Sequence, residues 1–81
     1  MAALKEGDIV EPVPVRWKGI RLDARGVVTK VYRTGCEVKM LDPMFEERNG
    51  EKYVEAGFVW HLDIDDWCLA KSNFLMSRSL L

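Results

Sequence analysis

The most reactive side chains in the chain are one histidine and two cysteines, His61, Cys36 and Cys68. A nucleophilic site needs a Cys or Ser beside a base that a third group orients, and nearby aspartates could supply that group. His61 follows Trp60 in an extended run, so the two side chains should point to opposite faces of a strand. We therefore expect His61 to be a partly exposed strand residue, and we do not expect an enzyme.

Metal and cofactor sites are not predicted either. Cys36, His61, Asp66 and Cys68 could ligate a metal, but the paired short spacings that mark zinc sites do not occur. The aspartates of residues 63–66 lack the spaced oxygens and glycine of an EF-hand, and turn capping explains them. The chain has no Gly-x-Gly-x-x-Gly and no phosphate-binding loop, so no cofactor is expected. Both cysteines lie in apolar, strand-like runs and are expected to be buried free thiols.

A basic stretch interleaved with aromatic rings is a second candidate site. Between residues 16 and 33 the only acidic residue is Asp23, while Trp17 and Tyr32 lie among six basic residues: Arg16, Lys18, Arg21, Arg25, Lys30 and Arg33. Basic groups follow phosphates and aromatic rings stack on bases, so the stretch could bind RNA or single-stranded nucleic acid weakly. The net charge of −1 and the pI near 5.8 argue against this. A solvated loop and strand face remains the alternative.

Large rings favour protein binding over nucleic-acid binding. A chain of 81 residues builds only a small core. Six rings are too many for it to bury completely: Trp17, Tyr32, Phe45, Tyr53, Trp60 and Trp67. Trp and Tyr beside Arg are typical anchors of protein interfaces, although Trp60 and Trp67 are expected in the core.

The end of the chain, residues 71–81, is more apolar than a solvated terminus should be. It either covers an open end of the domain or meets another chain, including a second copy in a homodimer. We therefore expect a small accessory or adaptor protein that binds another protein. Its predicted partner surface comprises Arg16, Trp17, Lys18, Arg21, Arg25, Tyr32, Arg33, Phe74, Leu75 and Leu80.

These side chains must be positioned by strands, and the clearest are in residues 23–40, which predict a β-hairpin. Two β-branched runs flank Arg33-Thr34-Gly35, where Gly35 is expected to take the positive φ of a tight connection. Alternation breaks once near Thr29, which predicts a β-bulge of the kind that lets a small barrel close. The predicted inner face is Val28, Val31, Cys36, Val38 and Met40.

The other strands are expected at residues 8–11, at 52–55 continuing at 57–62 after an interruption at Ala56-Gly57, and at 67–70. Between them we expect a long loop at 16–23, a polar excursion at 44–51 and a tight turn at 63–66. Pro12 and Pro14 cannot donate to a ladder, so the chain should lie at an edge or leave the sheet after residue 11.

This order of elements resembles an SH3-like barrel. The residues that carry the resemblance are Gly7-Asp8-Ile9-Val10, Arg25-Gly26-Val27-Val28-Thr29-Lys30-Val31, Glu37-Val38-Lys39-Met40 and Asp63-Ile64-Asp65-Asp66-Trp67. The chain is similar to a group of small accessory proteins that includes an SH3-like component of photosystem I, the variable subunit of ferredoxin–thioredoxin reductase and the end of the nitrile hydratase β-subunit. It is also similar to ribosomal and transcription-factor barrels with a Gly-x-Val-x-x-Val strand.

The resemblance implies an all-β, SH3-like five-stranded antiparallel barrel over residues 1–70, with a short apolar tail or helix over 71–81. It implies a fold and no activity. The Tyr-rich motif of peptide-binding signalling SH3 domains has no counterpart in residues 17–22, so proline-rich ligands are not implied.

Since neither a membrane-spanning nor a secretory signal is found, we expect a cytoplasmic protein. No segment approaches the roughly 18 apolar residues of a membrane span. The first residues, Met1-Ala2-Ala3-Leu4-Lys5-Glu6, lack the apolar core of a secretory signal, so neither a membrane nor an extracellular location is expected.

Overall fold

The computed structural model describes residues 4–70, which form seven β-strands and two single-turn 3₁₀ helices. The strands are β1 (Ile9–Pro12), β2 (Gly26–Val31), β3 (Gly35–Met40), β4 (Met44–Phe45), β5 (Lys52–Val54), β6 (Val59–Asp63) and β7 (Trp67–Leu69). The helices are η1 (Pro14–Arg16) and η2 (Ile64–Asp66). Over these residues no helix is both long and apolar enough to span a membrane. The predicted tail with Phe74, Leu75 and Leu80 lies outside the described residues, so the division at residue 70 stays a prediction.

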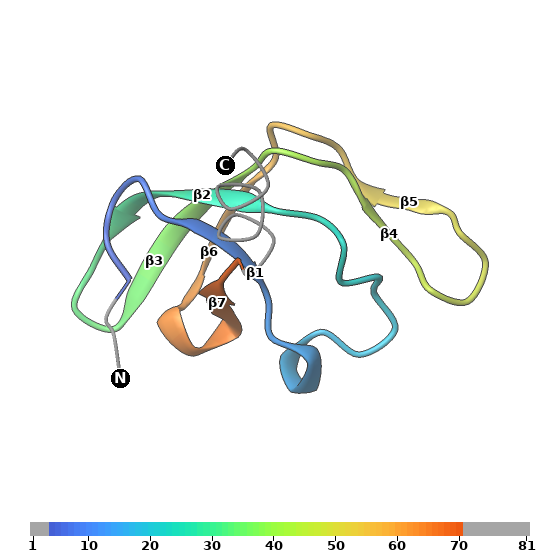
Figure 1. Cartoon of the computed structure of the whole chain (residues 1–81), viewed down its shortest axis with the longest axis horizontal. Helices are drawn as coiled ribbons and strands as arrows, with labels where there is room; N and C mark the ends of the chain where they lie inside the picture. The colour runs from blue at the N-terminus through green and yellow to red at the C-terminus, as the bar shows by residue number, and fades with distance from the viewer. Residues whose placement is uncertain (1–3, 71–81) are drawn as a thin grey trace, which may run out of the picture.

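Five of the strands form one antiparallel sheet in the order β6-β3-β2-β1-β7, and β4 pairs with β5 in a separate two-stranded sheet (Figure 1). The predicted five-stranded antiparallel sheet is therefore confirmed. The predicted closed barrel is not, because β6 and β7 do not pair with each other within residues 4–70. The short η2 redirects the chain after β6 so that β7 pairs with β1 instead.

The central hairpin, β2 and β3, contains the predicted bulge. Val28 lies opposite Val38, but the next pair is Lys30 opposite Glu37, so Thr29 is the extra residue. The Thr29 hydroxyl donates to Oε2 of Glu37 at 2.7 Å. One detail of the predicted inner face is wrong, because Val31, at the end of β2, is 38% exposed. The strand extends beyond the core at that point.

Two glycines of this hairpin are required by close contacts. Gly35 does not have the positive φ that the turn predicted. A Cβ at Gly35 would lie 2.9 Å from the carbonyl oxygen of Leu62 in β6, so the neighbouring strand excludes a side chain. A Cβ at Gly26 would lie 2.5 Å from Cγ1 of Val38, so the paired strand excludes a side chain there as well.

Pro12 ends β1 inside the sheet, one residue later than predicted. The N–H of Val13 donates to the carbonyl of Asp66, and that of Ala70 donates to the carbonyl of Ile9. Bonded pairs alternate in an antiparallel ladder, so the pair of Pro12 and Trp67 exchanges no bonds. On the other side β2 reaches only as far as Val10. Neither neighbouring strand would accept a hydrogen bond from residue 12, so proline is tolerated there.

The core lies beneath the large sheet and extends toward the β4–β5 hairpin. Its buried members are Leu4, Val10, Trp17, Ala24, Val28, Cys36, Val38, Met40, Met44 and Trp67. Met44 is fully buried, although residues 44–51 were expected to form a polar excursion. The apolar pair Met44-Phe45 instead forms β4, and the predicted strand at 52–55 is confirmed as its partner β5.

Candidate functional site

Five aromatic rings form a connected cluster at one side of the sheet. The ring of Trp60 on β6 contacts Trp17, Tyr53 and Phe58, at centroid distances of 5.1, 6.2 and 4.7 Å. Trp17 also contacts Trp67 at 5.2 Å. Edge-to-face and tilted pairs at these distances are favourable arrangements of aromatic quadrupoles. The cluster therefore joins the first loop, β5, β6 and β7 in space.

The carbonyl of Asp66 in η2 accepts hydrogen bonds from both Trp17 and Val13. The indole Nε1 of Trp17 donates to the carbonyl oxygen of Asp66 at 2.9 Å, and the N–H of Val13 donates to the same oxygen at 3.0 Å. The turn itself is capped, since the N–H of Asp63 donates to Oδ2 of Asp66 at 3.0 Å. The predicted tight turn at 63–66 is therefore confirmed, and it anchors the first loop.

A pocket of about 300 Å³ opens between this loop, β5 and β6. We call it the aromatic pocket, and its lining is Arg16, Trp17, Lys18, Ile20, Tyr53, Trp60, Leu62 and Asp66. Tyr53 is 49% exposed, whereas Trp17 is only 9% exposed. Trp17 was predicted as a partner-binding residue, but it is a core residue that offers one edge to the pocket. Tyr53 supplies most of the exposed ring surface.

Two cations and two carboxylates lie in or beside the aromatic pocket, and both carboxylates pair with the same cation. Arg16 lies 3.7 Å from Oδ1 of Asp66 and 4.0 Å from Oδ2 of Asp65, so its charge is compensated. Lys18 is exposed and forms no ion pair within residues 4–70. The pocket therefore combines an apolar aromatic wall with one lysine that forms no ion pair within the described residues.

The other predicted basic residues lie elsewhere, and two of them, Arg21 and Arg25, are paired. Arg21 pairs with Asp23 at 2.8 Å and stacks over the ring of Phe45. Arg25 pairs with Asp42 at 3.3 Å, and its backbone N–H donates to the same carboxylate. These carboxylates offset charge that phosphate binding would use, so the geometry gives the nucleic-acid alternative little support.

Tyr32 and Arg33 lie at the β2–β3 turn and line other pockets. The structure thus brings together Arg16, Trp17 and Lys18 and separates the other predicted residues from them. Sequence reasoning did not assign Tyr53, Trp60, Ile20, Leu62 or Asp66 to the site. Their common position depends on the β4–β5 hairpin, and no spacing in the sequence signals it.

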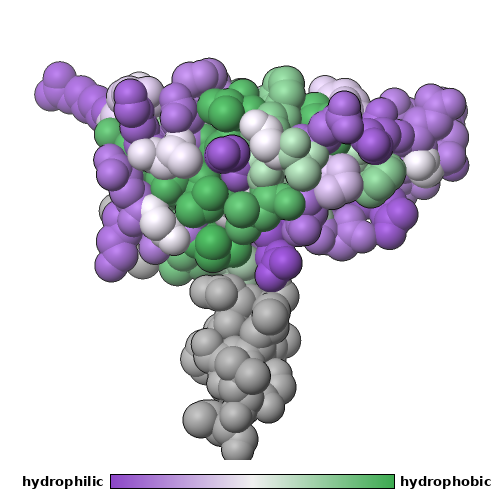
Figure 2. Space-filling model, turned by 90° about the horizontal axis from the view of Figure 1, so that it is seen from above, coloured by the Kyte–Doolittle hydropathy of each residue, from purple (hydrophilic) through white to green (hydrophobic). Residues whose placement is uncertain are grey.

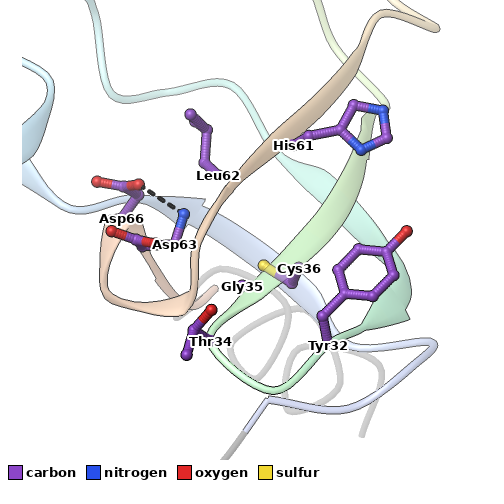
Figure 3. Close-up of a pocket in the computed structure, with 8 residues that line it drawn as sticks. All are labelled: Tyr32, Thr34, Gly35, Cys36, His61, Leu62, Asp63 and Asp66. Carbon is purple, nitrogen blue, oxygen red and sulfur yellow. Dashed lines mark hydrogen bonds between the residues drawn. The ribbon is translucent and has the colours of Figure 1, made fainter.

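A second pocket, of about 380 Å³, contains both Cys36 and His61 (Figure 3). The two side chains do not form a nucleophile and base. Cys36 lies opposite Leu62, and the next pair is Glu37 opposite His61, so Cys36 and His61 project from opposite faces of the sheet. His61 instead lies 3.7 Å from the Glu37 carboxylate.

The Cys36 thiol is also poorly suited to nucleophilic attack. Burial raises its pKa, and the negative charges of Asp66 and Asp63 raise it further. A protonated thiol is a weak nucleophile. Within residues 4–70 no group of three or more His, Cys, Asp and Glu side chains could hold a metal ion. Cys68 is exposed on β7, so the prediction that both cysteines are buried is wrong for Cys68. Cys68 follows the buried Trp67, so its side chain points to the opposite face of the strand, away from the core.

The chain was compared with models of protein families, with curated proteins and with solved structures, and no match was found.

Proposed function

We propose that the protein is a small, non-catalytic adaptor of the cytoplasm that binds another protein through the aromatic pocket. The observation that carries this proposal is the pocket itself. Three separate segments place an exposed tyrosine, Tyr53, against Trp60 and next to an unpaired lysine, Lys18. Aromatic rings that are rigid and partly exposed contribute large contact area at low entropic cost and dominate many protein interfaces.

We also propose an SH3-like fold, as the resemblance implies. Five strands, β1, β2, β3, β6 and β7, follow the expected order, with a long first loop, a bulged second strand and a single turn before the last strand. The β4–β5 hairpin is then an insertion between the third and fourth strands. It carries Tyr53 and so completes the pocket.

Exposed apolar surface supports binding to a protein. Tyr53, Phe58 and Tyr32 all remain exposed in the chain's described part. In the view of Figure 2, apolar side chains cover the middle of the molecule and hydrophilic side chains flank them. Contiguous apolar surface bordered by polar residues is typical of interaction sites.

The test is selection of peptides from a displayed random library on the full chain, followed by affinity measurements on the tightest peptide. Tyr53→Ala is expected to weaken its binding by about 30-fold, the loss typical of an interface hot spot of about 2 kcal/mol. Leu41→Ala is the matched control, because Leu41 is exposed to a similar degree and does not line the pocket. Its affinity should stay within about twofold of the parent.

Two outcomes would remove the proposal. One is a selected peptide that Tyr53→Ala and Leu41→Ala bind equally well, since binding would then occur outside the pocket. The other is selection of no peptide together with tight, salt-dependent binding of an RNA oligonucleotide that Arg21→Glu weakens. That result would favour the nucleic-acid alternative.

A further inference from the structure

The strand at one end of the large sheet, β6, borders the aromatic pocket. β6 pairs with β3 on one side only, and Trp60 and Leu62 of β6 line the pocket. Natural sheets usually protect an edge strand with a proline, a lysine or a bulge, or by keeping it short. β6 has the sequence Val-Trp-His-Leu-Asp, is five residues long and has regular pairing with β3. Within residues 4–70 it has none of these protections.

The direction of its backbone groups follows from the hydrogen bonds at its two ends. Just before β6, the carbonyl of Phe58 accepts from the N–H of Met40, so Phe58 faces β3. At the far end, the N–H of Asp63 turns away from β3 and donates to Asp66. Bonded and non-bonded pairs alternate in an antiparallel ladder. Trp60 and Leu62 therefore bond to β3, while Val59 and His61 present N–H and C=O groups to the open side.

The two outward residues are also accessible. Val59 and His61 are both exposed, and within residues 4–70 neither backbone N–H bonds to another segment. Their four backbone groups are two donors and two acceptors in a row, which is the pattern that an added antiparallel or parallel strand satisfies.

We infer that the partner is an extended, acidic and apolar peptide segment that adds to the sheet as a new strand along β6. This inference rests on the proposed function, because the same segment fills the aromatic pocket. Side chains of a strand alternate between faces, so an apolar side chain on the inner face would meet Trp60 and Tyr53. A carboxylate on the segment would pair with Lys18, which lines the pocket and forms no ion pair within residues 4–70.

The experiment uses the tightest selected peptide and the full chain. Single N-methylation of each peptide amide removes one donor at a time. Strand addition predicts that the affinity falls at least tenfold at alternate amides and changes little at the amides between them. Lys18→Glu should weaken binding of an acidic selected peptide by about tenfold, and this loss should shrink at high salt.

Val59→Pro removes the outward backbone N–H of Val59, which would donate to the added strand. Proline is tolerated at the first residue of a strand and where the N–H faces outward, so this variant should keep the fold. It should lose at least tenfold in affinity, while Leu41→Ala binds normally. If Val59→Pro does not fold, the N-methylation pattern decides alone.

The outcomes separate the inference from the proposed function. Loss of binding in Tyr53→Ala, with no alternating N-methylation pattern, overturns strand addition and leaves the pocket function intact. Equal binding by Tyr53→Ala and the parent overturns both. Formation of a dimer that Val59→Pro dissociates, measured by sedimentation without peptide, overturns the inference, because a second copy would then occupy the edge.

Discussion

Gly26→Ala tests the packing of the central hairpin most directly. The added Cβ would lie 2.5 Å from Cγ1 of Val38, 3.2 Å from the carbonyl oxygen of Lys39 and 3.3 Å from the sulfur of Met40. Val38 and Met40 are fully buried, so neither side chain can turn into solvent. Overpacking of this kind costs up to about 3 kcal/mol. The lower entropy of the unfolded alanine chain offsets about 1 kcal/mol of that.

The expected net loss is therefore about 2 kcal/mol of unfolding free energy. For a domain of this size each kcal/mol corresponds to about 4–8 °C, so the melting temperature should fall by about 8–16 °C. Thermal unfolding followed by circular dichroism measures this shift. A fall of less than about 2 °C would show that β2 and β3 are not packed as the structure has them.

A double-mutant cycle isolates the cause. Val38→Ala removes the atom nearest to the new Cβ and by itself should cost about 2 kcal/mol through lost burial and the cavity left behind. In that background Gly26→Ala should cost at least about 1 kcal/mol less than in the parent. Strictly additive effects would contradict a clash between these two positions and would refute the steric explanation.

Two further predictions concern single interactions. Trp17→Phe should lower the unfolding free energy in urea by about 1 kcal/mol more than Trp67→Phe, because only the indole of Trp17 donates a hydrogen bond within the described chain. Equal losses would mean that the bond to Asp66 contributes nothing measurable. For Cys36, burial raises the thiol pKa, so above the usual thiol pKa of about 8.5 the unfolded chain releases a proton that the folded chain retains. Stability should therefore fall as the pH rises beyond that value and should fall less in Cys36→Ala; an identical decline in both proteins would contradict the assignment.

Local patterns predicted the hairpin and the last part of the sheet well. Cys36, Val38 and Met40 alternate with charged residues, and period two is a direct sign of a strand with one buried face. The break near Thr29 located the bulge for the same reason. The Asp-rich turn was predicted because aspartates bond to nearby backbone, which is again a local effect.

The candidate site could not be predicted because its contacts are not local. Trp17 reaches the carbonyl of Asp66 across the fold, and Tyr53 stacks on Trp60 only because Met44 and Phe45 pair with β5. Two apolar residues within a polar segment are too few to show the period-two alternation that predicts a strand. The steric requirement for glycine at position 35 could not be predicted either, because it comes from contact with the Leu62 carbonyl of another strand.

The pairing of the first and last strands has a consequence for synthesis of the chain. β1 forms hydrogen bonds with β2 and with β7, and the second of these joins Val10 to Leu69. Contacts between such distant residues must close a long loop of chain, which slows folding. On the ribosome, one side of β1 stays unpaired until Leu69 has left the exit tunnel. Folding to the complete sheet is therefore expected only after the last described strand, β7, has emerged.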